Sequence, residues 1–230
     1  MQQNDNQTTD CKHFIDCFND LTEIELFNIT DNKLEVSYKK GEIIAKQGGF
    51  TSHIIYVKSG LIKQYIEDKD DKNNLILNVF GTGKLIGISS IFGDSVFRYS
   101  LATLEDSVIC LLEMNTIRKL ASENIKFSNT LLKSSNKKTL FAYNRIFNHT
   151  QKHLAGKISS VFIYLSEEVY YSKKFKLSLS RSELAGFAGV SRMSTIKILN
   201  ELKKDNIITE KNNYIEIIDL KALKHLSKIG

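Results

Sequence analysis

The chemistry open to this sequence is concentrated between residues 180 and 204, where polar, small and basic side chains recur at set spacings. Ser180 and Glu183 form an S-x-x-E pair, in which hydroxyl and carboxylate satisfy free backbone amides at the start of a helix. Ala185 and Gly189 are four residues apart, so a second helix can approach the small side chain before the chain turns sharply at the glycine. The pattern predicts a helix-turn-helix.

The second helix of this pair, capped by Ser191, has an apolar inner side made of Ile196, Ile198, Leu199 and Leu202. Polar and basic residues are left on the outer side of its first turns. In a helix-turn-helix these positions enter the major groove of DNA, where Arg binds guanine bidentately and Ser or Lys reaches phosphates or base edges. We expect DNA contacts from Ser180, Arg181, Ser191, Arg192, Met193, Ser194 and Lys197.

Two β-rich runs, residues 207–209 and 214–218, flank the turn 211–213 and predict a two-stranded wing. Lys211 at its tip would contact the DNA backbone. The alternative is a helix pair and hairpin that serve only as a scaffold. The alanine–glycine spacing, the capping residues and the wing together favour DNA binding.

The net charge of +6 lies entirely in the last third of the chain. Residues 1–149 carry 18 basic and 18 acidic side chains, whereas residues 150–230 carry 14 basic and 8 acidic ones. A basic region attached to a neutral one suggests a polyanionic partner. The alternative is a solvated, lysine-rich surface, and charge alone does not decide between them.

Short β-rich runs separated by glycine or charged turns fill residues 33–113 and predict a β-sandwich or roll. The runs are 34–38, 43–45, 54–57, 61–66, 75–80, 85–88, 99–104 and 108–113.

A long helix is predicted between residues 124 and 150, where no Gly or Pro interrupts the chain. One set of residues has the spacing of a coiled-coil seam: Leu132, Ser135, Thr139, Ala142, Ile146 and His149. A second stripe could cover the roll: Leu140, Tyr143, Phe147 and Leu154. Two apolar faces favour a homodimer; the alternative is one helix buried in a monomer. A further amphipathic helix is predicted at 157–168, and a turn or short ribbon carries Lys173, Lys174 and Lys176.

The stretch SRSELAGFAGVSRMSTIKILNELKKDNII, residues 180–208, resembles the helix-turn-helix of the Crp/Fnr superfamily. KKGEIIAKQG at 39–48, YVKSGLIKQY at 56–65 and GTGKLIG at 81–87 extend the resemblance over nearly the whole chain. It implies an α+β fold with three parts. These are an N-terminal segment and β-roll, a cyclic-nucleotide-binding-like jelly roll, at 1–113, a long dimerisation helix and hinge at 114–155, and a winged helix-turn-helix at 156–230.

The resemblance also implies a homodimer that binds an inverted repeat in double-stranded DNA, with RNA polymerase as a further partner. The roll would sense a signal and the long helix would relay it. Arg192, Ser194 and Lys197 fall on matching contact positions. Met193 stands where many members have Glu, and a thioether cannot accept a cytosine amino proton, so the usual half-site is in doubt.

The resemblance places an effector site at Gly87, Ile88, Ser89, Ser90 and Arg98. Ile88 occupies the position of the Glu that binds the ribose hydroxyl in cyclic-AMP-binding members. Since Ile cannot accept a hydrogen bond from that hydroxyl, we expect an effector other than cyclic AMP. Arg98 lies near the phosphate-binding position; the alternative is that it is an ordinary surface residue.

Cys11, Cys17 and Cys110 suggest a second kind of sensor, since members resembling Fnr hold an iron-sulfur cluster with four cysteines. The x5 spacing of Cys11 and Cys17 matches, but Thr8 replaces the first cysteine, so Asp10, another carboxylate or an exogenous group would have to complete the set. Inert thiols, another metal and a thiol switch are alternatives. A further alternative is a haem held by His149 or His153.

Two other classes of function compete with a DNA-binding regulator. A ligand-binding module without DNA binding would leave the basic helix-turn-helix unused. An enzyme would need a nucleophile–base pair, a zinc motif or a phosphate-cradling loop, and we find none in the sequence. The polar first ten residues and the absence of a long apolar run predict a cytoplasmic protein without a membrane partner.

Overall fold

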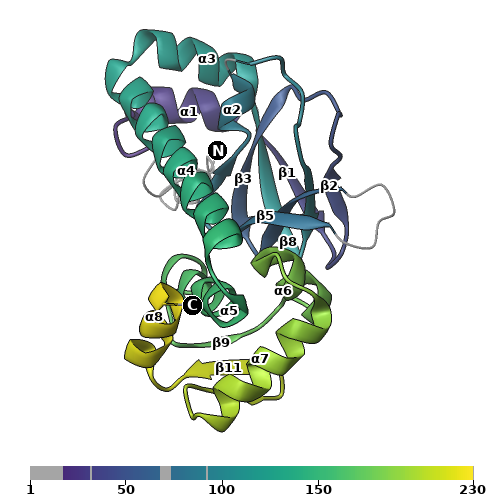
Figure 1. Ribbon diagram of the computed structural model, residues 1–230. Coiled ribbons are helices and arrows are strands. Elements are labelled where there is room, and N and C mark those ends of the chain that lie inside the picture. Colours follow the sequence, from purple (N-terminus) through teal and green to yellow (C-terminus); the bar gives the residue numbers. More distant parts are fainter. Residues whose placement is uncertain (1–17, 32, 68–73, 92, 230) are drawn as a thin grey trace. The chain divides into compact units, whose positions relative to one another are not determined.

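The computed structural model describes residues 18–31, 33–67, 74–91 and 93–229, and it divides the chain into two compact units (Figure 1). The first unit contains the residues up to 62 together with 81–139. The second contains residues 63–80 together with 140–230. The hairpin at 63–80 therefore groups with the C-terminal part of the chain.

The first unit is built on antiparallel strands. β1 (Leu34–Tyr38), β8 (Ser107–Glu113), β3 (His53–Ser59) and β6 (Leu85–Ile86) form one sheet in that order, and β2 (Ile43–Ala45) pairs with β7 (Ser100–Thr103). The register places Val36 opposite Ile109 and Ile55 opposite Leu111. The predicted run 85–88 was wrong in part, because the strand ends at Ile86 and the short helix α2 (Ile88–Ile91) follows.

Helices supply the other half of this unit's core: α1 (Glu23–Asp31), α3 (Met114–Glu123) and the first turns of α4 (Ile125–Gln151). Phe18 stacks on Phe127 with ring centroids 6.0 Å apart, and both are buried with side chains from β3 and β8. The side-chain oxygen of Asn124 accepts hydrogen bonds from the backbone amides of Lys126 and Phe127, both at 3.0 Å, and so starts α4. The predicted long helix is confirmed; α1 was not predicted.

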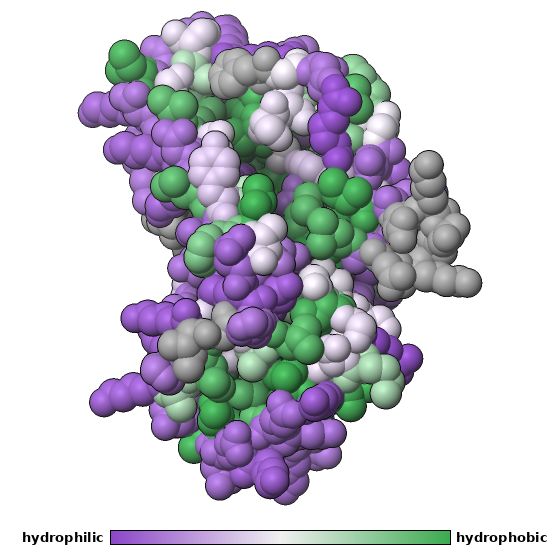
Figure 2. Space-filling view, viewed as in Figure 1, coloured by the Kyte–Doolittle hydropathy of each residue, from purple (hydrophilic) through white to green (hydrophobic). Residues whose placement is uncertain are grey.

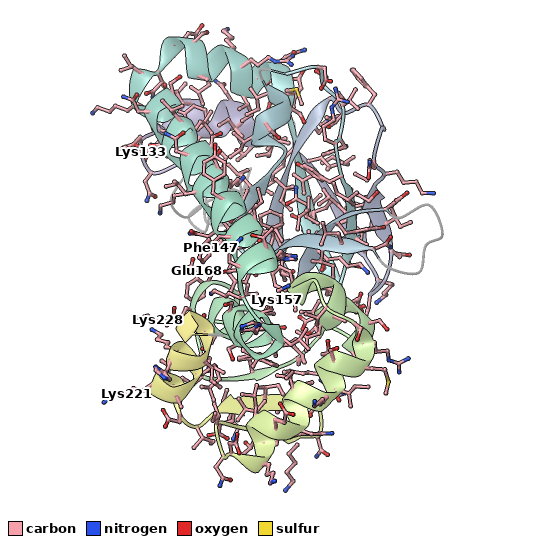
Figure 3. The ribbon with its side chains drawn as sticks, viewed as in Figure 1. Lys133, Phe147, Lys157, Glu168, Lys221 and Lys228 are labelled. Atoms are coloured by element: carbon pink, nitrogen blue, oxygen red, sulfur yellow. The ribbon has the colours of Figure 1, made fainter. Side chains whose placement is uncertain are left out.

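The second apolar stripe that was predicted to cover the roll is exposed. Leu140, Tyr143, Phe147 and Leu154 are 62%, 63%, 58% and 42% exposed (Phe147 is labelled in Figure 3). Ile146 is 61% exposed beside them. The exposed apolar surface of α4 therefore includes Leu140, Tyr143 and Phe147 and is wider than the predicted seam.

The second unit contains β4 (Ile62–Ile66) from Lys63 onward and β5 (Leu75–Phe80), which are neighbours in a sheet, and the end of α4. It continues with α5 (Leu154–Tyr164), the π-helical turn η2 (Leu165–Val169), β9 (Lys174–Lys176), α6 (Arg181–Ala188) and α7 (Arg192–Lys204). β10 (Ile208–Lys211), β11 (Tyr214–Ile217) and α8 (Leu220–Ile229) complete it. None of the helices in the part of the chain that the structure describes could cross a membrane.

The wing has three strands in the order β10-β11-β9, whereas two were predicted. Phe175 of β9 lies opposite Ile215 of β11, and both are buried. The lysine-rich segment 173–176 therefore belongs to the wing sheet. α8 was not predicted either.

Candidate DNA interface

The start of α6 is fixed by the predicted capping box, which is confirmed. The hydroxyl of Ser180 accepts a hydrogen bond from the Glu183 amide at 3.2 Å, and the Glu183 carboxylate accepts one from the Ser180 amide at 2.8 Å. The other oxygen of Glu183 pairs with the Lys63 ammonium of β4 at 2.7 Å. Burial favours the neutral acid, but the hydrogen bonds from Lys63 and Ser180 keep the pKa of Glu183 below its ordinary value.

The turn between the two helices requires Gly189 for two separate reasons. Its φ of +66° is left-handed, and its amide donates to the carbonyl of Ala185 and so caps α6. A Cβ at this position would lie 2.2 Å from Nδ1 of His149, near the end of α4. Burial, with the nearby charges of Arg145 and Lys157, lowers the pKa of His149 to about 4, so the ring against the turn is neutral.

Helix α7, the recognition helix, has its rotation fixed by a cap and by buried side chains. The Ser191 hydroxyl accepts a hydrogen bond from the Ser194 amide at 3.0 Å. Thr195 is fully buried, and its hydroxyl donates to the Ser191 carbonyl at 3.1 Å. Ile198, Leu199 and Leu202 are buried on the same side, and Ile196 is half-buried.

Three predicted contact residues face solvent at the start of the recognition helix: Arg192, Met193 and Lys197. Met193 is 76% exposed, and the ammonium of Lys197 lies 3.9 Å from the Glu201 carboxylate. Ser194 is half-buried and shares a hydrogen bond of 2.9 Å with the Ser191 hydroxyl. The space-filling view shows that hydrophilic residues gather at the bottom of the second unit (Figure 2).

The tip of the wing is a two-residue turn, Asn212 and Asn213, with φ of 51° and 64°. Two left-handed residues in succession are typical of the hairpin turn whose twist matches that of its strands. Lys211 is exposed beside this turn and ends β10.

Arg181 lies apart from the exposed contact residues because its guanidinium pairs with Glu210 of the wing. Lys203, near the end of the recognition helix, approaches the same carboxylate at 3.3 Å. Burial favours the neutral acid, but the two cations lower the pKa of Glu210 below its ordinary value. Glu210 thus ties α6, α7 and the wing together. This contact was not predicted from the sequence, because Arg181 and Glu210 are 29 residues apart along the chain.

A second group of side chains, which was not predicted from the sequence, packs against α6. The Phe187 ring lies 4.3 Å from the Arg145 guanidinium and 5.6 Å from the Tyr164 ring. Arg145 donates to the Ile76 carbonyl at 3.0 Å, and Tyr164 donates to the Asn78 side chain at 2.5 Å. Burial lowers the pKa of Arg145 to about 10. Helix α6 is thereby packed against α4, α5 and β5.

The hairpin of β4 and β5 also approaches the turn of the helix pair. A Cβ on Gly186 would lie 2.5 Å from the Asn74 carbonyl oxygen, so α6 meets the hairpin backbone at a residue without a side chain. A groove of about 640 Å³ lies beside this contact, and Lys63, Tyr65, Ser191 and Arg192 are among its lining residues.

The comparisons with known protein families agree with this geometry. Residues 35–124 match the model described as cyclic nucleotide-binding domain, and residues 156–226 match the Crp-like helix-turn-helix domain. The chain belongs to the Crp/Fnr family. Since residues 156–226 match the Crp-like helix-turn-helix domain, this Crp/Fnr chain is a transcription regulator, and a ligand-binding module without DNA binding is not favoured.

Relatives of this Crp/Fnr regulator carry regulatory names. Electron transport regulator A of Shewanella oneidensis is 24% identical over 88% of this chain and 81% of its own length. A fumarate and nitrate reduction regulatory protein of Yersinia pestis is 22% identical over 88% of this chain and 81% of its own length. The fold is similar to that of FixK2 from Bradyrhizobium japonicum, with a TM-score of 0.78, 16% identity and coverage of 84% and 96% of the two chains.

Of the predicted effector residues of this Crp/Fnr regulator, only some line the same hollow. Ile88 and Ser89 line a hollow of about 410 Å³ with Ser128, Leu132 and other residues of α4. Gly87 has a φ of +97°, and Ser90 is buried. Arg98 is not among the lining residues; it is exposed and pairs with Asp94.

Of the predicted cysteine ligands, the structure describes Cys110, whereas Cys11 and Cys17 lie outside the described residues. Cys110 is buried in β8, and its Sγ lies 4.0 Å from a carboxylate oxygen of Glu35. Within the described ranges no three His, Cys, Asp or Glu side chains are close enough to hold a metal. A cluster would therefore need ligands in addition to Cys110.

Proposed function

We propose that this regulator binds an inverted-repeat operator in duplex DNA as a homodimer. The observation that carries the proposal is the exposed start of the recognition helix, where Arg192 and Lys197 face solvent. Thr195, on the opposite side of this helix, is fully buried. The excess of basic over acidic residues in the last third of the chain would favour binding to phosphates.

Each contact residue has a role that follows from its surroundings. Arg192 binds guanine through bidentate hydrogen bonds from its guanidinium, and Lys197 reaches a base edge or a phosphate. Lys211 contacts the backbone from the wing. Ser180 and Ser191 cap helices whose free N-terminal amides can bind phosphates, and Ser194 supports the second cap. Arg181 acts through Glu210, by holding the wing against α6.

The dimer forms through α4. Regulators of this family act as dimers, and α4 exposes Leu132, Leu140, Tyr143, Ile146 and Phe147 on a helix of 27 residues. Burying a large apolar side chain contributes about 1.5–3 kcal/mol. Two copies of this surface can therefore stabilise a dimer, and a two-fold axis along α4 would present two recognition helices to an inverted repeat.

The signal is not cyclic AMP, because Ile88 offers no acceptor to a ribose hydroxyl. Names that refer to electron transport and to fumarate and nitrate reduction support a redox, oxygen or nitrosative signal. Such a signal acts through Cys11, Cys17 and Cys110, with an iron-sulfur cluster or thiol oxidation as the chemistry and haem as the alternative. If the cysteines are inert, an effector binds instead at residues 87–90 and Arg98.

The protein works in the cytoplasm, contacts RNA polymerase when bound at a promoter, and has no catalytic activity of its own. The chain is divided into a sensor at 1–113, a dimerisation helix and hinge at 114–155, and a DNA-binding domain at 156–230.

In vitro selection from a pool of randomised duplexes tests the proposal. The purified chain should enrich one sequence with two-fold symmetry, and sedimentation should show two chains per selected duplex. Enrichment of no sequence, at a salt concentration where the chain still binds DNA, would contradict sequence-specific recognition.

A further inference from the structure

Met193 is unusual among the side chains of the recognition helix. It is 76% exposed, whereas the other large apolar residues of α7 are buried or half-buried. A single exposed apolar residue needs no explanation on an ordinary surface. Met193, however, lies between two exposed cations in the surface proposed to enter the major groove, so its chemistry bears on which base it meets.

The position of Met193 follows from contacts elsewhere in the helix. The cap at Ser191 sets the first residue of α7, and buried Thr195 sets its rotation. Residues of a helix are about 100° apart, so Met193 points nearly opposite to Thr195. Lys197, four residues on, lies on the same face. Met193 and Lys197 are thus presented together, with Arg192 at the helix start.

A methionine can offer very little to most base edges. Its thioether donates no hydrogen bond and accepts only weakly. Guanine, adenine and cytosine present polar donors or acceptors in the major groove, and covering them with a thioether leaves those groups unpaired. Thymine alone presents an apolar group there, the 5-methyl.

We infer that Met193 reads the 5-methyl group of a thymine in the operator half-site. The inference rests on the proposed function, since it requires the recognition helix to lie in the major groove. It specifies the half-site: a guanine bound by Arg192 with a thymine close by. A carboxylate at position 193 would instead accept a hydrogen bond from the cytosine amino group, so Met193→Glu should change the base preferred at one position.

Replacing thymine by uracil tests this directly, because it removes only the methyl group. The operator is first selected with the wild-type chain, and each thymine of the half-site is then replaced by uracil in turn. At one position the affinity should fall about fourfold, and about fifteenfold when both half-sites are changed.

Protein variants connect this effect to the side chain. Met193→Ala should bind the thymine and uracil operators equally, whereas Met193→Leu, which keeps an apolar side chain, should retain a preference for thymine. Arg192→Ala is the matched control: it should bind more weakly yet keep the same ratio between the two operators. Because Met193 is exposed, its variants should unfold at the wild-type temperature.

The outcomes separate this inference from the proposed function. If the wild-type chain selects no sequence, the proposed function fails. If it selects an operator but uracil is tolerated at every thymine, or if Met193→Ala discriminates uracil as well as the wild type does, DNA reading stands and the role of Met193 is overturned.

Discussion

Replacing Gly189 by alanine should destabilise the helix pair through two separable effects. Alanine at a φ of +66° costs about 1–2 kcal/mol, because its Cβ crowds the backbone. The same Cβ would lie 2.2 Å from the ring of half-buried His149, and displacing a packed neighbour costs about 1–3 kcal/mol. We therefore expect the free energy of unfolding to fall by about 2–5 kcal/mol in all.

A double-mutant cycle with His149→Ala separates the two effects, because it removes the ring and leaves the backbone conformation unchanged. The coupling measured by urea unfolding should be about 1–3 kcal/mol, and the remaining loss about 1–2 kcal/mol. Zero coupling would show that the end of α4 does not pack against the turn. A Gly189→Ala variant as stable as the wild type would refute the left-handed turn itself.

Three further predictions concern the dimer, the wing and the signal. Ile146→Glu should convert the dimer to a monomer in sedimentation, because it sets like charges across the two-fold seam; a wild type that is already monomeric at micromolar concentration, with and without DNA, would end this idea. The pKa of Glu210 is lowered from its ordinary value of 4.5 in the folded protein. The ionised carboxylate therefore stabilises the fold fully above pH 4.5, and this stabilisation is lost as the pH falls through the folded pKa. Glu210→Gln should therefore flatten acid unfolding below that pH, and an unchanged acid limb would show that the pair with Arg181 adds nothing. A Cys11, Cys17 and Cys110 triple serine variant should lose its response to oxygen or nitrite, whereas normal regulation would make the thiols structural.

The parts of the fold that the sequence predicts correctly depend on local chemistry. The capping box at Ser180 and the turn at Gly189 are each set by residues within a few positions of one another. The long helix was equally clear, since nothing between 124 and 150 interrupts it. Such features need no knowledge of distant segments.

The features that were missed depend on contacts between distant parts of the chain. Arg181 and Glu210 are 29 residues apart, and Arg145 and Ile76 are 69 apart. The third strand of the wing is recognisable only once Phe175 is seen opposite Ile215. The stripe through Tyr143 was assigned to the roll because an apolar face indicates burial without indicating the partner.

The measurement that tests the central claim most directly compares Arg192→Ala with the wild type on the selected operator and on random duplex of equal length. Lys221→Ala removes an equal charge from α8 (Figure 3) and is the control. Arg192→Ala should lose about 1–3 kcal/mol per subunit on the operator and almost nothing on random DNA, while Lys221→Ala leaves the difference between the two DNAs unchanged. Equal loss on both DNAs in the Arg192 variant would contradict base reading by the recognition helix.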